Sequence, residues 1–215
     1  MDIREPFEKY STITRHVFTC MHPFMSFVME SPLRRTFNDP VKTLKGARIR
    51  AGQKVLEVGC GTGYFTTPAA KLVGDSGLIH AIDVYPPAID CVSKKIRDAH
   101  VTNVKLTNAD AMDSGLPGSS FDLILLFGVI PAPVLPLDRL LPEMYRLLKP
   151  KGALAVWTFF PWWSPASVTG TRLFTYTSKE NGVYNFQRSE YMYISQTQHQ
   201  GERTITKDKL KGDSY

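Results

Sequence analysis

The segment KVLEVGCGTGYFT, residues 54–66, carries the residues best suited to hold a ligand. Gly59, Gly61 and Gly63 follow an apolar, β-branched run, and the acid Glu57 stands two residues before the first of them. Glycines let a ligand approach the backbone closely, and a helix that starts after them turns free N–H groups toward it. The segment predicts a cofactor cradle, with a plain strand-to-helix turn as the alternative.

The spacing of the glycines separates the known kinds of nucleotide site. A dinucleotide fold has the pattern G-x-G-x-x-G, whereas this segment has G-x-G-x-G. A P-loop is excluded because no Gly-Lys-Ser/Thr follows. The pattern therefore argues against a nicotinamide-dependent oxidoreductase.

Residues 54–160 alternate short apolar runs with longer helical patterns, which is typical of βαβ units and a parallel sheet. The expected strands are residues 54–58, 78–83, 104–108, 121–128 and 152–160. The expected helices are residues 63–73, 85–99 and 135–152, and Pro142 is expected to mark the true start of the last one. Asn181-Gly182 between two aromatic-rich arms predicts a β-hairpin, and only a short helix fits before it.

Two flanking regions differ from this core. Residues 1–50 place Phe, Met and Val at helical spacing between prolines, which predicts short helices packed on the sheet domain. Residues 51–188 form the expected main domain. Residues 189–215 are polar and balanced in charge, so we expect a loosely held or disordered tail.

Four ordered motifs then carry a family resemblance. VLEVGCGTGYF, AIDVYPPAI, TNADAMDSGLPGSSFDLILL and LLKPKGALAVW resemble, in register, the motifs of class I S-adenosylmethionine-dependent methyltransferases. The resemblance covers about half the chain and is strongest to small-molecule enzymes of ubiquinone and menaquinone biosynthesis. It implies an α/β three-layer sandwich with a Rossmann-like, seven-stranded sheet whose last strand is antiparallel.

The resemblance also implies which residues hold S-adenosylmethionine and its product S-adenosylhomocysteine. Asp83 matches the acid that accepts hydrogen bonds from the ribose hydroxyls, and Asp110 the acid that accepts from the adenine amino group. Glu57 matches the acid that orients the methionyl ammonium. The remaining expected contacts are the three glycines with Cys60, Val84, Ala111 and Phe127, where Cys60 is read as a small filler.

The acceptor is less visible than the donor. After the fourth strand the sequence LLFGVIPAPVLP lacks the motifs of nucleobase methyltransferases and predicts an apolar floor from Phe127, Val129, Ile130 and Val134. Methyl transfer needs alignment and exclusion of water more than dedicated catalytic groups. We therefore expect a small-molecule acceptor; RNA or protein side-chain methylation and a non-catalytic donor-binding module are alternatives.

The resemblance also implies that residues 1–50 form an N-terminal lid over the site. Its candidates for contact with donor or acceptor are, in order, Tyr10, His16 and His22. His16, Cys20 and His22 also suggest a metal site, but no second ligand pair is visible, so no metal is expected. Trp162 and Trp163 are expected either to stack on a substrate or to pack in the core.

Composition sets the remaining limits. Residues before Lys54 contain nine Lys and Arg against five Asp and Glu, within a chain of formal charge +6. Their basic side chains either grip a phosphate or carboxylate of the acceptor or form solvated faces, and nucleic acid is not a favoured partner. These side chains are Arg34, Arg35, Lys42, Lys45, Arg48 and Arg50.

No apolar run is long enough to span a membrane, and three cysteines without CxxC spacing fit a reducing cytoplasm. The oligomeric state is open, a homodimer included.

Overall fold

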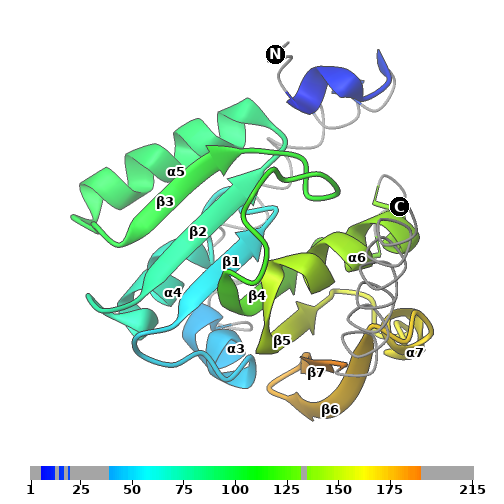
Figure 1. Cartoon of the computed structure of the whole chain (residues 1–215). Coiled ribbons are helices and arrows are strands. Elements are labelled where there is room, and N and C mark those ends of the chain that lie inside the picture. The colour runs from blue at the N-terminus through cyan, green and yellow to red at the C-terminus, as the bar shows by residue number, and fades with distance from the viewer. Residues whose placement is uncertain (1–5, 13–14, 17–18, 20–38, 132–134, 190–215) are drawn as a thin grey trace, which may run out of the picture.

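A seven-stranded sheet in the order β3-β2-β1-β4-β5-β7-β6 forms the centre of the protein (Figure 1). The computed structural model describes residues 6–12, 15–16, 19, 39–131 and 135–189. The strands are β1 Lys54–Val58, β2 Leu78–Asp83, β3 Val104–Asn108, β4 Phe121–Phe127, β5 Leu148–Trp157, β6 Phe174–Glu180 and β7 Val183–Arg188. The helices are the 3-10 helix η1 Pro6–Lys9 and the α-helices α3 Pro40–Gly46, α4 Thr66–Val73, α5 Pro86–Asp98, α6 Leu137–Leu147 and α7 Ala166–Thr169.

The strand directions confirm the predicted topology. Strands β1 to β5 pair in parallel, and β7 is antiparallel to both β5 and β6. Asn181 and Gly182 both have positive φ, 47° and 80°, which a two-residue hairpin turn of this kind requires. The expected short helix before the hairpin is α7.

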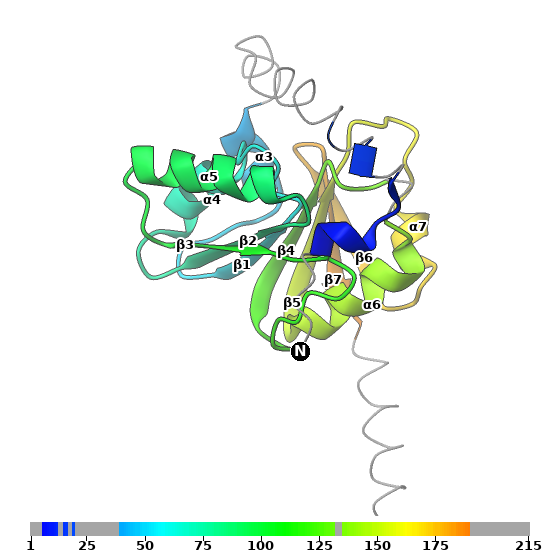
Figure 2. The ribbon, with the colours of Figure 1, turned by 90° about the horizontal axis from the view of Figure 1, so that it is seen from above.

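Helices cover both faces of the sheet (Figure 2), and apolar side chains pack between them and the strands. Leu123 and Leu125 of β4 pack with residues of α3, α4 and α5 on one face, whereas Ile124 and Leu126 pack with residues of α6 and α7 on the other. This alternation follows from the two-residue period of a strand, and burial on both faces explains the nearly continuous apolar sequence of β4. The three-layer sandwich is thus confirmed.

The prediction that Pro142 starts its helix was wrong. Helix α6 begins at Leu137, directly after Pro136, and Pro142 lies inside it. Proline removes one backbone donor and leaves the carbonyl four residues earlier without its helical partner. Because Pro142 is exposed, that carbonyl can lie on the solvent side of the helix. The apolar face of α6, with Leu140, Leu141 and Met144 fully buried, fixes the helix across the proline.

Two other element bounds differ from expectation. Helix α4 begins at Thr66, because Gly63 has a φ of 79°, outside the right-handed helical region. Strand β5 begins at Leu148, before the Pro150 and Gly152 that were expected to end the preceding helix. Its pairing with β4 jumps from Phe121↔Leu148 to Leu123↔Ala153, so residues 149–152 bulge out of the ladder.

The flanking regions are described only in part. Within residues 1–50 the structure gives η1, a few residues up to Thr19, and residues 39–50. The tail from residue 190 lies outside the described residues, so the lid, the tail and the domain bounds stay predictions. In the described part of the chain, no helix combines the length and apolar character needed to cross a membrane.

Candidate donor site

The glycine loop and the expected acids meet at the carboxyl ends of β1, β2 and β3. The backbone N–H groups of Gly59 and Cys60 both donate to the carbonyl of Ile82, at 2.8 and 3.1 Å, which ties the loop to the end of β2. The order of the strands reverses at β1, between β2 and β4. In open parallel sheets, ligands bind beyond the carboxyl ends of the strands at such a reversal.

The three glycines of the loop serve different purposes. A Cβ on Gly59 would lie 2.9 Å from Val129 Cγ2, and one on Gly63 would lie 3.1 Å from Val92 Cγ2. A Cβ on Gly61 would meet no atom within 4 Å. Gly59 and Gly63 thus allow close packing inside the protein, and Gly61 borders open space; contact of all three glycines with a donor stays a prediction.

Asp83 holds the loop and the start of the next helix together. Its Oδ2 accepts a hydrogen bond from Gly61 N and its Oδ1 accepts one from Tyr85 N, both at 2.9 Å. A carboxylate oxygen can accept more than one hydrogen bond. The backbone thus fixes Asp83 beside Gly61, as a ribose-binding acid would require.

Asp110 is the buried member of the two acids after β3. It is 8% exposed, and its Oδ1 accepts a hydrogen bond from Met112 N at 2.9 Å, whereas Asp113 is exposed. Ala111 beside it is also buried. The side-chain amide of Asn108 donates to the carbonyls of Asp83 and Val84, which joins the end of β3 to the end of β2. The structure therefore brings Asp110 and Asp83 to neighbouring strand ends.

The N-terminal segment reaches these acids. Burial raises the pKa of Tyr10 above its usual range, and the charge of Asp110 and a hydrogen bond to it add to this shift, with a smaller contribution from Asp83. Phe7 packs edge-on against Tyr85, with ring centroids 5.1 Å apart. Tyr10 thus lies on the Asp110 side of the site. His16 is exposed, and Cys20 and His22 lie outside the described residues.

Glu57 is a buried acid of β1, two residues before Gly59. Burial raises its pKa to about 8, the nearby Thr66 hydroxyl lowers it, and the charge of Asp83 raises it further. Within the described residues, Glu57 Oε2, Thr62 Oγ1 and Thr66 Oγ1 are buried without a partner in hydrogen-bond geometry. Unpartnered buried oxygens are costly in a folded protein, so they indicate a place for a donor group of a ligand.

Two expected contact residues have core environments. Cys60 is 5% exposed, and burial, with the charges of Asp83 and Glu57, raises the pKa of its thiol well above its usual range. The thiol is therefore an inert, small side chain, as expected. Phe127 packs edge-on against Phe65, with centroids 5.0 Å apart, and lies beside Trp157. Whether Phe127 or Val84 contacts a donor stays a prediction.

The residues expected on the acceptor side divide into core and surface. Val129 and Ile130 are buried, and Val134 lies outside the described residues. Trp163 packs against Tyr184 in the core, whereas Trp162 is 77% exposed. Of the two alternatives for the tryptophans, core packing holds for Trp163. An aromatic surface remains at the end of β5, with Phe159, Phe160 and Trp162 exposed.

Four residues of the site were not predicted from the sequence. Thr62 and Thr66 lie in the glycine segment itself, and their hydroxyls were the available signal. Tyr85, two residues after Asp83, and Phe7 had no such signal, because only the fold brings them into contact. Among the residues described, no cluster of His, Cys, Asp and Glu is arranged to hold a metal ion.

Comparisons with known proteins agree with this geometry. Residues 55–152 match the family model described as "Methyltransferase domain". A demethylmenaquinone methyltransferase of Listeria welshimeri is 30% identical over 154 residues, 71% of this chain and 60% of the relative. One of Lactobacillus johnsonii is 35% identical over 117 residues, 54% of this chain and 47% of the relative. The chain thus spans about half the length of the curated relatives it matches.

Solved structures share the fold. A SAM-dependent methyltransferase from Aquifex aeolicus superposes with a TM-score of 0.66 at 22% identity, over 77% of this chain and 97% of that one. The cyclase SpnF superposes with a TM-score of 0.52 at 21% identity, over 63% of this chain and 56% of that one. The fold alone therefore does not decide the reaction. The fold, the matched family model and the relatives together identify residues 55–152 as a class I methyltransferase domain of the S-adenosylmethionine-dependent type.

Proposed function

We propose that this protein transfers a methyl group from S-adenosylmethionine to a small, apolar acceptor. The observation that carries the donor assignment is the set of buried, unpartnered oxygens on Glu57, Thr62 and Thr66. The methionyl ammonium has three N–H donors, and a positive charge is what a buried carboxyl requires in order to ionise. The open space at Gly61 supports the same fit, because a side chain would enter it.

We propose that Asp83 and Asp110 bind different parts of the adenosine group. Asp83 would accept from the ribose hydroxyls, since Gly61 N and Tyr85 N hold its carboxylate beside the glycine loop. Asp110 would accept from the adenine amino group, chiefly with Oδ2, since Oδ1 already accepts from Met112 N. Hydrogen bonds to a charged acceptor are about twice as strong as neutral ones, so both acids contribute affinity and orientation.

The bound donor supplies an electrophilic methyl group. The chain's own residues would then align the acceptor and exclude water, which for a displacement from a sulfonium accounts for much of the acceleration. The buried apolar residues Phe127, Val129 and Ile130 after β4 support an apolar acceptor. We propose Tyr10, His16 and His22 as lid residues, with Tyr10 on the adenosine side because it lies near Asp110.

The relatives suggest the acceptor class. Their name, demethylmenaquinone methyltransferase, denotes a planar apolar ring system as acceptor. We propose an acceptor of this chemistry for the present chain. The exposed aromatic side chains Phe159 and Phe160 after β5 are of a type that packs well on such a ring.

The experiment that tests this function uses methyl-labelled S-adenosylmethionine. The protein is incubated with a reduced, short-chain demethylmenaquinone, and in parallel with fractions of cell extract that contain small molecules, RNA or protein. We expect label in the quinone and in the apolar small-molecule fraction. Label in RNA or protein alone would contradict the acceptor class, and donor binding without any transfer would favour the non-catalytic module.

A further inference from the structure

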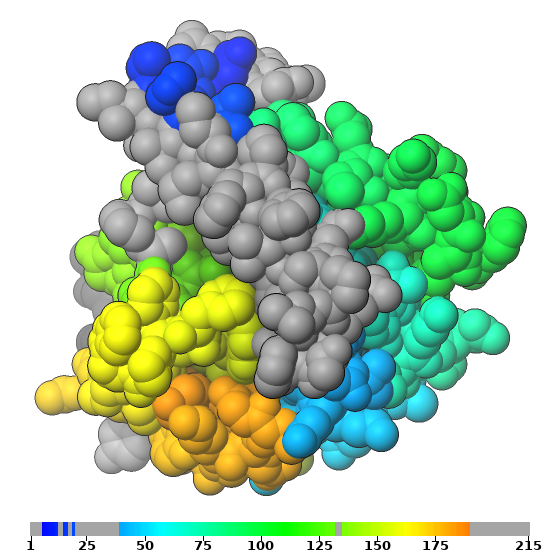
Figure 3. Space-filling view, turned by 180° about the vertical axis from the view of Figure 1, so that it is seen from behind, coloured from blue at the N-terminus to red at the C-terminus, as the bar shows by residue number. Residues whose placement is uncertain are grey.

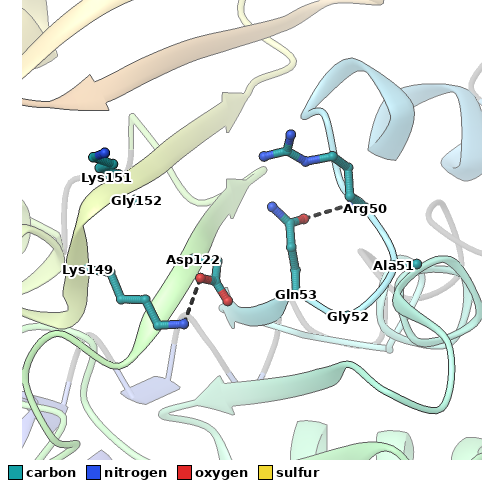
Figure 4. Close-up of a pocket in the computed structure, with 8 residues that line it drawn as sticks. All are labelled: Arg50, Ala51, Gly52, Gln53, Asp122, Lys149, Lys151 and Gly152. Carbon is teal, nitrogen blue, oxygen red and sulfur yellow. Dashed lines mark hydrogen bonds and ion pairs between the residues drawn. The ribbon is translucent and has the colours of Figure 1, made fainter.

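A hollow of about 390 Å³ opens at the edge of the sheet opposite the donor site (Figure 4). It lies between the loop that leads into β1, residues 50–53, and the starts of β4 and β5. Because β1, β4 and β5 are parallel, their amino ends share one edge and the donor site lies at the other. The hollow is therefore a separate feature of the molecule.

The bulge in β5 supplies one wall of the hollow. Residues 149–152, with the sequence KPKG, leave the ladder with β4 and place Lys149 and Lys151 at the rim. Gly152 closes the bulge: a Cβ there would lie 2.8 Å from Leu148 Cδ2 and 3.0 Å from the carbonyl oxygen of Phe121. The bulge and its two lysines are thus fixed by the packing of the sheet.

The side chains around the hollow leave an excess of positive charge. Arg50, Lys149 and Lys151 are cationic and Asp122 is anionic, which gives a net charge of +2. Asp122 Oδ1 accepts from Lys149 Nζ at 2.7 Å, and Oδ2 accepts from Lys54 N at 2.8 Å. Burial alone would raise the pKa of Asp122, but these bonds lower it overall, so the carboxylate neutralises Lys149. Arg50 and Lys151 have no ion-pair partner among the described residues.

Three side chains around the hollow, Gln53, Arg50 and Lys151, offer hydrogen-bond donors. Gln53 Oε1 accepts from Arg50 N at 2.7 Å, which leaves the side-chain N–H₂ group as the free end of the amide. In the described part of the chain, neither this group, the guanidinium of Arg50 nor the ammonium of Lys151 makes a hydrogen bond. Figure 4 shows Arg50 and Gln53 facing the side on which Asp122 and Lys149 lie. Apart from the Asp122 carboxylate, which is paired with Lys149, the side chains named here offer hydrogen-bond donors, and such a rim suits an oxyanion.

We propose that the hollow binds a phosphate-type anion through Arg50, Lys151 and Gln53. A guanidinium binds two phosphate oxygens at once, and an ammonium adds a point charge. The volume is many times the roughly 30 Å³ that one water occupies, so a diphosphate or a phosphate monoester has room. The anion is either a free phosphate compound or the headgroup of an acidic lipid. The proposal does not depend on methyl transfer.

Two probes test the site with the full chain at low ionic strength. Pyrophosphate is titrated into the protein by calorimetry, and phosphatidylcholine vesicles with and without phosphatidic acid are sedimented with it. The variant Arg50→Gln/Lys151→Gln removes two positive charges at the hollow. The control Lys71→Gln/Lys94→Gln removes two exposed positive charges on α4 and α5.

We expect saturable binding of at least one probe, weakened roughly tenfold or more in the Arg50 and Lys151 variant and little changed in the control. Binding of pyrophosphate identifies a free phosphate compound as the ligand class, and binding of acidic vesicles alone identifies a lipid headgroup. Equal loss in both variants would show that affinity follows net charge only and would overturn the proposal. So would the absence of binding to either probe. S-adenosylhomocysteine affinity, measured in parallel, reports on an intact fold.

Discussion

Gly61 allows the effect of backbone conformation to be tested separately from the effect of blocking a ligand. Its φ of 52° is left-handed, and the space in front of it is open. Gly74, at the end of α4, also has a left-handed φ, 65°, and open space, but lies away from the acids. Both positions therefore have a positive φ, and they differ in what a side chain would obstruct.

We expect Gly61→Val to abolish binding of S-adenosylhomocysteine, because the valine side chain would enter the space proposed for the donor. Gly74→Val should keep that affinity within about threefold, although the positive φ at both positions makes both changes destabilising. Calorimetric titration of both variants measures the difference. Unchanged affinity in the Gly61 variant would remove the donor from this loop.

Glu57 makes the stability of the protein depend on pH. Its pKa rises from an ordinary 4.5 to about 8 in the folded protein, because burial disfavours the charged form. The folded state therefore binds this proton more tightly than the unfolded state. The resulting stabilisation is fully present below pH 4.5 and is lost as the pH rises through 8.

Glu57→Gln should remove this contribution, since the amide does not titrate. Between these two pKa values, the free energy of unfolding of the wild type should fall relative to the variant by up to about 1.4 kcal/mol per pH unit. Urea denaturation at a series of pH values measures both proteins. Parallel curves would show that Glu57 keeps an ordinary pKa.

Among the elements, η1 and the residues directly after it contact the candidate site. Figure 1 shows η1 away from the helices that cover the sheet, at the side where the loop after β3 lies. Its contacts there are Phe7 on Tyr85 and Tyr10 with Asp110. A segment that contacts the edge of a site is suited to cover a bound donor.

A double-mutant cycle tests whether this segment packs on the site. Tyr10→Phe and Asp110→Asn should show a coupling of about 0.5–3 kcal/mol in the free energy of unfolding, the range for residues in direct contact. Asp110→Asn keeps an oxygen for Met112 N, so the local turn is preserved. The cycle of Tyr10→Phe with Asp113→Asn is the control and should be additive. Additivity in both cycles would place the segment elsewhere.

For the molecule as a whole, the contact between α3 and the β6–β7 hairpin joins distant parts of the chain (Figure 3). Asn185 is 4% exposed, and its Nδ2 donates to the carbonyl of Gly46 at 2.9 Å. A Cβ on Gly46 would lie 2.3 Å from the carbonyl oxygen of Glu180, so glycine is required for this approach. The exposed Arg48–Glu180 ion pair lies at the same junction.

Asn185→Ala should lower the free energy of unfolding by about 1–3 kcal/mol, because it leaves the buried Gly46 carbonyl without its side-chain donor. Thr175→Ala, which removes an exposed hydrogen bond to Ser189 on the same hairpin, should cost less than about 0.5 kcal/mol. Urea denaturation compares the two. Equal costs would mean that the buried bond does not anchor the hairpin.

Much of this architecture was predictable because it depends on local pattern. Strands β1, β2 and β3 have the expected bounds, since short apolar runs between turn residues identify buried strands. The hairpin followed from Asn181-Gly182, and the glycine loop from its spacing. The start of α6 was mispredicted because tertiary burial of Leu140 and Leu141 outweighed the local effect of Pro142.

The sequence by itself determined the order of strands and helices, the glycine loop and the acids at the strand ends, because each depends on residues close together in the chain. Only the tertiary structure decided that Gly61, of the three loop glycines, borders open space, that Tyr10 reaches Asp110, and that Arg50 shares a hollow with Lys151. These facts depend on which distant segments the packed sheet brings together, and no local spacing encodes that.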